Sequence, residues 1–278
     1  MDGDPTLEPR QRDRYSRQLL IEGIDPADQR TLLSSCVLVV GVGGLGSSII
    51  QYLAAAGVGT IGIVDDGRVK RSNLQRQVIH TVDDIGDPKV DSAARFVDAL
   101  NPAIDVETHE TRIDPSNAEP LLEGHDVVVD ALDNFVGRFV VNDAAVLAGI
   151  PFVHGAVYSF EGQTTVFRPD GPCYRCLLPE LPDEEGIPSD EPMGVFPTVP
   201  GTIGCLQATE VLKLLLEIGD PLEGHLLRYD GTDATFLRTP LKCDPDCPLC
   251  GPNGPEIESL ETVAYDDRCR IERSASTE

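Results

Sequence analysis

Glycines between two short apolar runs constrain the fold of this chain more than any other feature. The first run, residues 37–40, leads into four glycines: Gly41, Gly43, Gly44 and Gly46. A helical pattern follows, and a second apolar run, residues 61–64, ends at Asp65. Strand, glycine turn, helix, strand and acid in this order are typical of the mononucleotide-binding half of a doubly wound sheet. We therefore predict an α/β fold with a Rossmann-like, mostly parallel sheet.

The glycine turn and Asp65 together predict a nucleotide site. Glycines let the backbone approach a phosphate, and a helix N-terminus offers unpaired N–H groups to an anion. An acid at the end of the second strand is placed to accept hydrogen bonds from a ribose. These features fit both ATP and a nicotinamide dinucleotide, so they leave an NAD-dependent oxidoreductase open as an alternative.

Cationic side chains after Asp65 favour ATP. Asn73 and Arg76 follow in the segment SNLQRQ, and Lys89 stands at the start of the next predicted helix. Fixed cations suit a triphosphate whose charge grows during reaction, whereas hydride transfer needs them less. A single Arg or Lys is usually a solvated surface charge. Lysine is rare in this chain, however, which favours a specific role for Lys89 over that of a solvated surface charge.

The segment DALDN adds a carboxylate to the same region. Residues 127–129 read as a buried strand that ends at Asp130, and Asp133 and Asn134 follow. Because ligands of open parallel sheets bind outside the carboxyl ends of the strands, we expect Asp133 on the same rim as the glycine turn. A carboxylate facing phosphates is a natural ligand for hydrated Mg²⁺. The alternative is an N-cap of the helix expected over residues 135–148.

The rest of the chain predicts a mixed sheet with an antiparallel extension. Residues 151–157 read as a further strand, and residues 162–168 alternate like an antiparallel one. After a helix over 203–218, strands near 226–229 and 235–237 would extend the sheet. The remaining expected elements are helices over 10–21, 25–34, 89–100 and 116–122 and a strand over 104–107.

Two CxxC pairs among Pro and Gly residues predict a closed Cys₄ zinc site. The ligands would be Cys173, Cys176, Cys247 and Cys250, with Cys243 as an alternative ligand. About 70 residues separate the pairs, more than the roughly 15–20 of a compact zinc ribbon. The metal would therefore have a structural role and attach a C-terminal segment to the domain. Two disulfides are the alternative, which a reducing compartment disfavours.

The charge balance excludes some classes of partner. With a formal net charge of −25, the chain would repel the phosphates of a nucleic acid. Acidic residues are spread along the chain, Arg outnumbers Lys and Trp is absent. This pattern indicates a halophile, because screening at high ionic strength tolerates such a charge. A mesophilic acidic protein with a basic partner is the alternative.

The length of the chain predicts one large domain with appendages, and its hydropathy predicts a cytoplasmic location. No apolar run approaches the ~20 residues that span a bilayer, and residues 1–15 contain no apolar signal segment. We expect N-terminal helices over 1–34, a nucleotide-binding domain over 35–251 and a polar, flexible tail over 252–278. Within the domain, the Pro- and acid-rich segment 179–200 is expected to form a long crossover loop.

Several motifs, taken in order, carry a resemblance to one known family. Between residues 14 and 251 the chain reads RYSRQ, GVGGLGSSIIQYLAAAGVG, DDGRVKRSNLQRQ, GDPKV, DALDN, EGQTTVF, PCYRC, GTIGCLQATE and DCPLCG. It closely resembles the MoeB/ThiF family of ubiquitin-activating-like adenylyltransferases, and among these the archaeal enzymes that activate small ubiquitin-like modifier proteins. The order and spacing of the motifs are more specific than any one of them.

This resemblance implies a reaction and a set of roles. The terminal carboxylate of a ubiquitin-fold carrier protein ending in Gly-Gly would attack the α-phosphate of Mg-ATP, and the products would be an acyl-adenylate and pyrophosphate. Downstream, the product would serve sulfur transfer, in molybdopterin synthesis or tRNA thiolation, or protein conjugation. Arg17 resembles an arginine that the family extends across a homodimer interface. The other implied roles are Gly44 under the phosphates, Asp65 on the ribose, Asn73, Arg76 and Lys89 on the triphosphate, and Asp133 on Mg²⁺ with Asn134 beside it.

The chain departs from the family at one position. Relatives that form a thioester or pass sulfur place a cysteine in the loop before the final helix, and that position falls at Asp190. Adenylation would survive this change. For a thioester step, Cys205 or Cys269 would have to replace the missing cysteine; otherwise another protein would take the acyl-adenylate directly. An adenylation-deficient binding paralogue, and an enzyme that adenylates a small molecule or a tRNA base, are further alternatives.

Overall fold

One mixed sheet organises the described part of the chain. The computed structural model describes residues 7–179, 194–253 and 257–265. Within these residues the sheet has eight strands in the order β3-β2-β1-β4-β5-β6-β7-β8, the first five parallel and the last three antiparallel. The strands are β1 (Cys36–Val40), β2 (Thr60–Val64), β3 (Asp105–His109), β4 (Val127–Asp130), β5 (Phe152–Tyr158), β6 (Glu161–Phe167), β7 (His225–Asp230) and β8 (Thr235–Pro240). The predicted mixed sheet with an antiparallel extension is confirmed.

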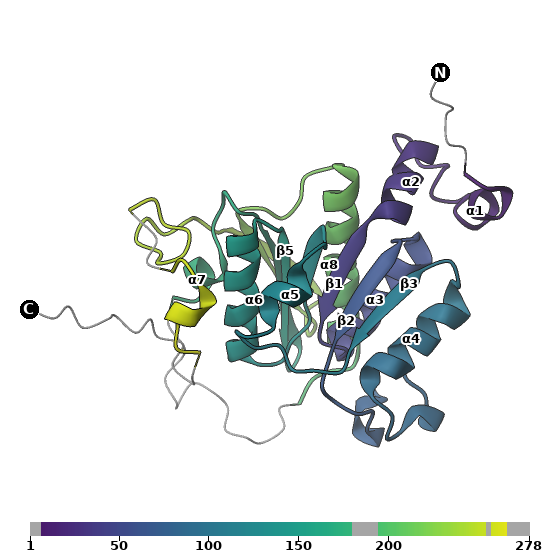
Figure 1. Cartoon of the computed structure of the whole chain (residues 1–278), viewed down its shortest axis with the longest axis horizontal. Coiled ribbons are helices and arrows are strands. Elements are labelled where there is room, and N and C mark those ends of the chain that lie inside the picture. Colours follow the sequence, from purple (N-terminus) through teal and green to yellow (C-terminus); the bar gives the residue numbers. More distant parts are fainter. Residues whose placement is uncertain (1–6, 180–193, 254–256, 266–278) are drawn as a thin grey trace, which may run out of the picture.

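Helices cover both faces of this sheet (Figure 1). The first face packs against α3 (Gly44–Ala56), α4 (Lys89–Leu100) and α8 (Thr198–Leu216), and the second against α5 (Ala118–Leu122) and α6 (Phe135–Ala148). In β1, Val39 belongs to the first hydrophobic cluster and Leu38 to the second, because successive side chains of a strand point to opposite faces. A strand covered on both sides needs an unbroken apolar run, which explains residues 37–40.

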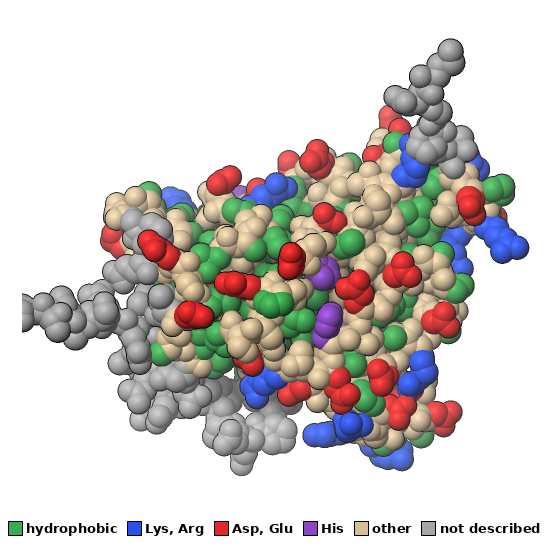
Figure 2. Space-filling view, in the orientation of Figure 1, with side chains coloured by type: hydrophobic (Ala, Val, Ile, Leu, Met, Phe, Trp, Pro, Cys, Tyr) green, Lys and Arg blue, Asp and Glu red, His purple; other side chains and the backbone are tan. Residues whose placement is uncertain are grey.

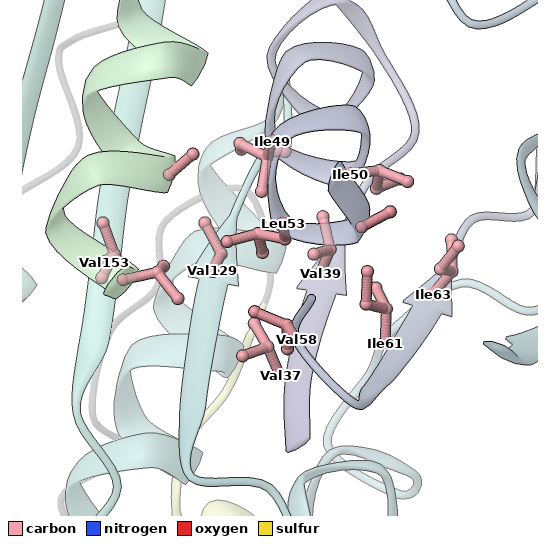
Figure 3. Close-up of a cluster of buried hydrophobic side chains, with 14 of the residues drawn as sticks. Val37, Val39, Ile49, Ile50, Leu53, Val58, Ile61, Ile63, Val129 and Val153 are labelled. Carbon is pink, nitrogen blue, oxygen red and sulfur yellow. The ribbon is translucent and has the colours of Figure 1, made fainter. Parts of the chain in front are cut away.

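The helix that follows the glycine turn supplies much of the first cluster. Figure 3 shows Ile49 and Leu53 of α3 lying over Val39 and Val129 of the sheet. All four side chains are fully buried. Burying a side chain of this kind contributes about 1.5–3 kcal/mol relative to leaving it exposed. This packing fixes the start of α3, and with it the glycine turn, against the ends of β1 and β4.

The N-terminal segment differs from the expected helix over residues 10–21. The helix α1 (Pro9–Arg14) ends early, and turns lead to α2 (Pro26–Ser34). The reason is Tyr15, which is buried and whose hydroxyl accepts a hydrogen bond from Asn101 Nδ2 at 3.0 Å. A Cβ at Gly57 would lie 2.6 Å from the Tyr15 ring. The chain therefore turns after α1 to place Tyr15 against the C-terminal end of α3.

The segment before the final helix is described in part. Residues 180–193, and with them Asp190, lie outside the described residues, as does Cys269. Where the description resumes, Val195 bridges to Ser159, and α8 begins at Thr198 rather than near residue 203. The helix starts earlier than its apolar pattern because its first turn includes Pro200, which suits the beginning of a helix.

The segment after Gly251 does not match the expected flexible tail. Ile257, Leu260 and Val263 are buried, and the short 3₁₀ helix η3 (Leu260–Thr262) lies against α6. Figure 1 shows this segment beside α6 and α7 (Tyr174–Leu177). The apolar residues are too few and too widely spaced to predict an element from sequence, so the prediction of a flexible tail from residue 252 is wrong for residues 257–265.

Acidic side chains are spread over the surface in Figure 2 and do not gather in one concentrated patch on that face. Figure 2 shows Asp and Glu side chains scattered over all parts of this face, with Lys and Arg fewer between them. No helix in residues 7–179, 194–253 and 257–265 is long and apolar enough to cross a membrane.

Candidate functional site

The glycine turn joins β1 to α3 at the carboxyl end of the parallel strands. Gly41 has φ +104°, and a Cβ there would lie 2.5 Å from the carbonyl oxygen of Ala131. A Cβ at Gly46 would meet the carbonyl oxygen of Gly41 at closer than contact distance. These two glycines are therefore required by the packing of the turn against the end of β4 and against itself.

Gly43 is different, because space remains above it. The nearest atom to a Cβ at Gly43 would be Gln77 Nε2 at 3.9 Å. Gly43 is the N-cap of α3 and offers no side chain to the first N–H groups of the helix. Those N–H groups have no intrahelical partner and carry the positive end of the helix dipole. The open face of the turn is thus suited to an anion such as a phosphate.

Asp65 links the second strand to this turn. Its Oδ2 accepts a hydrogen bond from the backbone N–H of Val42 at 2.7 Å, and its Oδ1 accepts one from Gly67 at 2.7 Å. Lys89 Nζ lies 3.5 Å from Asp65 Oδ2. Both side chains are largely buried, with Asp65 11% exposed and Lys89 15% exposed. Lys89 is the first residue of α4. The structure therefore brings this cation to the glycine turn.

Arg76 also lies close to the glycine turn. A Cβ at Gly44 would lie 3.4 Å from Arg76 Cγ, and it would also meet Pro200 of α8. Arg76 Nη1 donates a hydrogen bond to the carbonyl of Ser72 at 3.2 Å. Asn73 closes the short 3₁₀ helix η1 (Arg71–Asn73), and its Oδ1 accepts from the backbone N–H of Lys70 at 2.8 Å. The half-buried arginine thus lies with its stem against the turn.

The turn after β4 completes this rim. Ala131 touches Gly41, and two residues later Asp133 is exposed. The N-cap of α6 is Asn134, whose Oδ1 accepts from the backbone N–H of Gly137 at 2.8 Å. The alternative that Asp133 caps this helix is therefore wrong. Asp133 lies in the turn after β4, one residue before the cap.

Arg17 lies away from this rim. It is exposed and follows Tyr15, which packs at Gly57, the C-cap of α3. The glycine turn stands at the other end of that helix, and 13 residues at 1.5 Å each give a length of about 20 Å. The structure therefore does not bring Arg17 into the site of its own chain.

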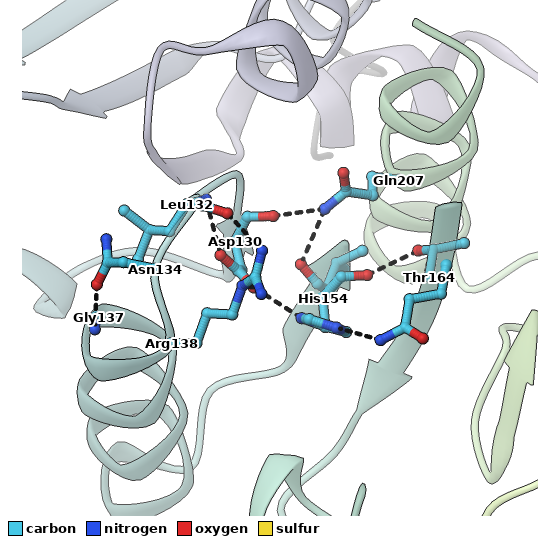
Figure 4. Close-up of polar contacts among 10 residues, drawn as sticks. Asp130, Leu132, Asn134, Gly137, Arg138, His154, Thr164 and Gln207 are labelled. Carbon is cyan, nitrogen blue, oxygen red and sulfur yellow. Dashed lines mark hydrogen bonds and ion pairs between the residues drawn. The ribbon is translucent and has the colours of Figure 1, made fainter. Parts of the chain in front are cut away.

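A buried polar cluster behind the rim was not predicted from sequence. Asp130 is fully buried, and its Oδ2 accepts a hydrogen bond from His154 Nδ1 at 2.7 Å. Arg138 Nε lies 3.4 Å from the same oxygen (Figure 4). Burial lowers the pKa of His154, which makes the neutral imidazole the form that donates here. The only sequence signals were an acid ending an apolar strand and an arginine within an apolar helix.

The four predicted zinc ligands come together on the side of α6. The Sγ atoms of Cys173, Cys176, Cys247 and Cys250 all lie within 4.8 Å of one another. The Sγ atoms of Cys173 and Cys247 are 3.6 Å apart, and those of Cys176 and Cys250 are 3.4 Å apart. Zinc–sulfur bonds of about 2.3 Å at a tetrahedral centre place sulfurs about 3.8 Å apart, so the cluster fits zinc.

Two other thiols are not members of this set of four. Cys243 Sγ lies 3.7 Å from Cys250 Sγ but does not belong to the mutually close set. Cys205 is half-buried in α8, and burial raises its pKa. A raised pKa reduces the thiolate fraction, so Cys205 lacks the electropositive setting of a reactive cysteine.

Comparisons with known proteins show the family of this chain. A model of the ThiF family matches residues 15–249. The chain belongs to the ThiF family. Over 266 residues this ThiF-family chain is 53% identical to the SAMP-activating enzyme E1 of Haloferax volcanii, covering 96% of this chain and 98% of the relative. It is 46% identical to the sulfur carrier protein adenylyltransferase of Thermus thermophilus, covering 91% and 96%.

Two further comparisons bear on domain content and fold. The ThiF-family chain is 43% identical to the adenylyltransferase and sulfurtransferase MOCS3 of Mus musculus, of which it spans 57%. A crystal structure of E. coli MccB matches with a TM-score of 0.79 and 23% identity, covering 88% of this chain and 74% of MccB. At that identity the match shows the shared fold alone.

Proposed function

We propose that this chain adenylates the C-terminal glycine of a ubiquitin-like or sulfur carrier protein at the expense of ATP. The observation that carries the proposal is the convergence of an open glycine turn, two cations and the turn bearing Asp133 on one rim of the sheet. The names of the two relatives that match nearly end to end agree with it, since one is a SAMP-activating enzyme and the other an adenylyltransferase of a sulfur carrier protein.

ATP would lie across the carboxyl ends of β2, β1 and β4. The first N–H groups of α3 would receive a phosphate, as helix N-termini do. Arg76 and Lys89 would neutralise the triphosphate, with Asn73 beside them, and Asp65 would accept hydrogen bonds from the ribose. Asp65 Oδ2 already accepts from the Val42 N–H and from Lys89 Nζ, whereas Oδ1 accepts only from the Gly67 N–H and has a second lone pair for a ligand.

The chemistry asks for positioning rather than for an activated nucleophile. An oxygen of the carrier's terminal carboxylate, already ionised at neutral pH, bonds to the α-phosphorus, and the bond from that phosphorus to the bridging oxygen breaks. The products are the acyl-adenylate and pyrophosphate, and no proton has to be removed first. Fixed cations that meet charge growing on the pyrophosphate would then account for most of the rate.

Asp133 is the residue suited to hold Mg²⁺ at this rim. It is exposed at a turn pressed against the glycine turn, and it is free of the capping role that Asn134 takes. Mg²⁺ usually takes one or two protein carboxylates together with substrate phosphates and water, so a single carboxylate fits. Bound Mg²⁺ would neutralise phosphate charge, and Asp133 would hold it in register with the turn.

Two further parts of the proposal concern assembly. Arg17 lies at the far end of α3 from its own glycine turn, so it would serve the site of a second copy in a homodimer. The four clustered cysteines would hold zinc in a closed, structural site. No thiol of this chain is assigned a covalent step, and the acyl-adenylate would be the released or transferred product.

The test is exchange of radioactive pyrophosphate into ATP. We expect exchange with ubiquitin-fold carriers that end in Gly-Gly, and none with the same carriers lacking those two glycines. Asp133→Ala should reduce exchange about 100-fold or more, the scale of losing one preorganised electrostatic group. Asp105→Ala is the matched control, since Asp105 is exposed at the opposite, amino end of the parallel strands. No exchange with any carrier would overturn the proposal.

A further inference from the structure

The backbone of residues 130–132, which leads to Asp133, is held by the buried side chain of Asp130 itself and by buried side chains from α6 and α8. Asp130 Oδ1 accepts from the N–H of Leu132 at 2.9 Å, and Arg138 Nη2 donates to the Leu132 carbonyl at 2.7 Å. Gln207 Nε2 donates to the Asp130 carbonyl at 2.7 Å. Figure 4 shows these groups gathered around the end of β4. Each peptide group of the turn next to the rim is thus tied down from behind.

His154 orients the carboxylate on which this arrangement depends. Its Nδ1 donates to Asp130 Oδ2 at 2.7 Å, and its Nε2 is 3.4 Å from Gln163 Nε2. That partner is an N–H donor, which leaves the proton of the neutral ring on Nδ1. The ring is itself held between aromatic neighbours, with the centroid of Tyr174 at 4.9 Å and that of Phe167 at 6.2 Å. The carboxylate therefore has one available orientation.

The charges in this cluster balance without solvent. Asp130 is 0% exposed and the Arg138 side chain 10% exposed. A buried ion pair contributes little net stability compared with apolar residues of similar volume, because desolvation offsets the attraction. Such a pair directly behind an exposed acid is better explained by the geometry that it imposes. Metal ligands in proteins are commonly oriented by a second layer of hydrogen bonds in this way.

We propose that Asp130, Arg138 and His154 are positioning residues that fix the 130–134 turn so that Asp133 meets the metal-nucleotide at the glycine turn. This inference rests on the proposed function, which assigns Asp133 to Mg²⁺. The contact of Ala131 with Gly41 transmits the constraint, because a shift of the turn would move Asp133 relative to the phosphates. Arg138 acts through the Leu132 carbonyl and touches no substrate.

The test measures Mn²⁺ binding by electron paramagnetic resonance in the presence of an α,β-methylene ATP analogue. Mn²⁺ prefers the same oxygen ligands as Mg²⁺. His154→Phe keeps an aromatic ring among its neighbours but removes the donor to Asp130, and Arg138→Lys keeps the charge but removes the planar fork. Both should weaken Mn²⁺ binding about 10-fold or more, the range seen for lost outer-layer partners. His154→Asn, whose amide can replace Nδ1–H, should recover most of the affinity.

Thr164→Val is the structural control. Thr164 is buried beside the cluster, and its Oγ1 donates to the His154 carbonyl at 2.8 Å without touching Asp130. We expect this variant to lower the melting temperature while leaving Mn²⁺ affinity within twofold of the parent. If either His154→Phe or Arg138→Lys fails to fold, the other variant decides the question.

The outcomes separate the inference from the function beneath it. A parent protein with no nucleotide-dependent Mn²⁺ binding and no pyrophosphate exchange overturns the proposed function, and the inference falls with it. A parent with both activities, alongside folded His154→Phe and Arg138→Lys variants of unchanged Mn²⁺ affinity, overturns the inference alone. Equal weakening in His154→Phe and His154→Asn would also overturn it, because the donor would then be irrelevant.

Discussion

Gly41 and Gly43 stand two residues apart in the same turn and are constrained by different things. Gly41 has a positive φ and the Ala131 carbonyl against it, whereas Gly43 faces space that no atom of the described chain fills within 3.9 Å. A methyl group added at Gly41 would therefore overlap protein atoms, whereas one added at Gly43 would make only ordinary contacts, the nearest with Gln77 Nε2 at 3.9 Å.

We expect Gly43→Ala to keep the melting temperature within a few degrees of the parent while reducing ATP affinity about 10-fold or more, because the added Cβ occupies the approach of an anion to the helix N-terminus. Gly41→Ala should instead destabilise the fold by more than about 1 kcal/mol, since alanine is strained at positive φ. Thermal unfolding and equilibrium binding of the ATP analogue separate the two effects. Loss of stability without loss of affinity in Gly43→Ala would contradict the phosphate seat.

At the scale of elements, the cysteine cluster joins two segments far apart in the sequence. Cys173 is the N-cap of α7, while Cys247 and Cys250 follow the antiparallel extension. Ile257 and Val263 pack around the same cysteines. The cysteine cluster therefore contributes to the attachment of the C-terminal segment, in addition to the direct contact of η3 with α6.

We expect Cys250→Ser to lose zinc and to lower the melting temperature, because a structural zinc site contributes folding free energy directly. Cys243→Ser is the control, since Cys243 lies outside the set of four and should keep one zinc per chain. Metal content by atomic emission and thermal unfolding provide the measurements. Equal zinc content in the two variants would show that the ligand set is assigned wrongly.

Elements with a strong local pattern were predictable from sequence, and those shaped by distant contacts were not. The helix expected over 135–148 has the bounds of α6, because it begins with an Asn cap and ends at Gly149 in the left-handed region. Helix α1 was overestimated, since burial of Tyr15 ends it. The packing of residues 257–265 was not predicted, because their partners lie on α6 and around the four clustered cysteines, and most of these are far away in the sequence.

The candidate site divides in the same way. Parallel strand order places the glycine turn, Asp65 and Asp133 on one rim, so their approach could be predicted from the strands alone. The support behind them could not, because Asp130, Arg138 and His154 come from β4, α6 and β5. Their pairing exists only once those elements are packed, and no spacing in the sequence announces it.

At the scale of the whole molecule, Arg17 tests whether one chain makes a complete site. We expect Arg17→Ala and Asp133→Ala to be inactive separately and to regain about a quarter of parental exchange when mixed in equal amounts and allowed to re-assort. Half of the dimers would then be mixed, and each would contain one intact site of two, as a twofold-symmetric interface requires. Pyrophosphate exchange after mixing is the measurement, and no recovery would contradict action across an interface.

The charge of the whole chain leads to a salt prediction. A net charge of −25 opposes the compact state by self-repulsion, which added ions screen. We expect the melting temperature to rise as KCl increases from low concentration to molar levels. Sucrose at equal osmolality serves as the comparison without screening. A melting temperature that is flat or falling with KCl would remove the case for a halophilic protein.

The tight contact of Gly41 and Gly46 has a consequence for how such chains change over evolutionary time. A descendant that had lost its chemistry would still be selected to retain both glycines, because neither position tolerates a methyl group while the turn stays folded. Gly43 would be free to drift in that lineage. A glycine retained at position 43 is therefore a better indicator of retained catalysis than the presence of the whole glycine-rich motif.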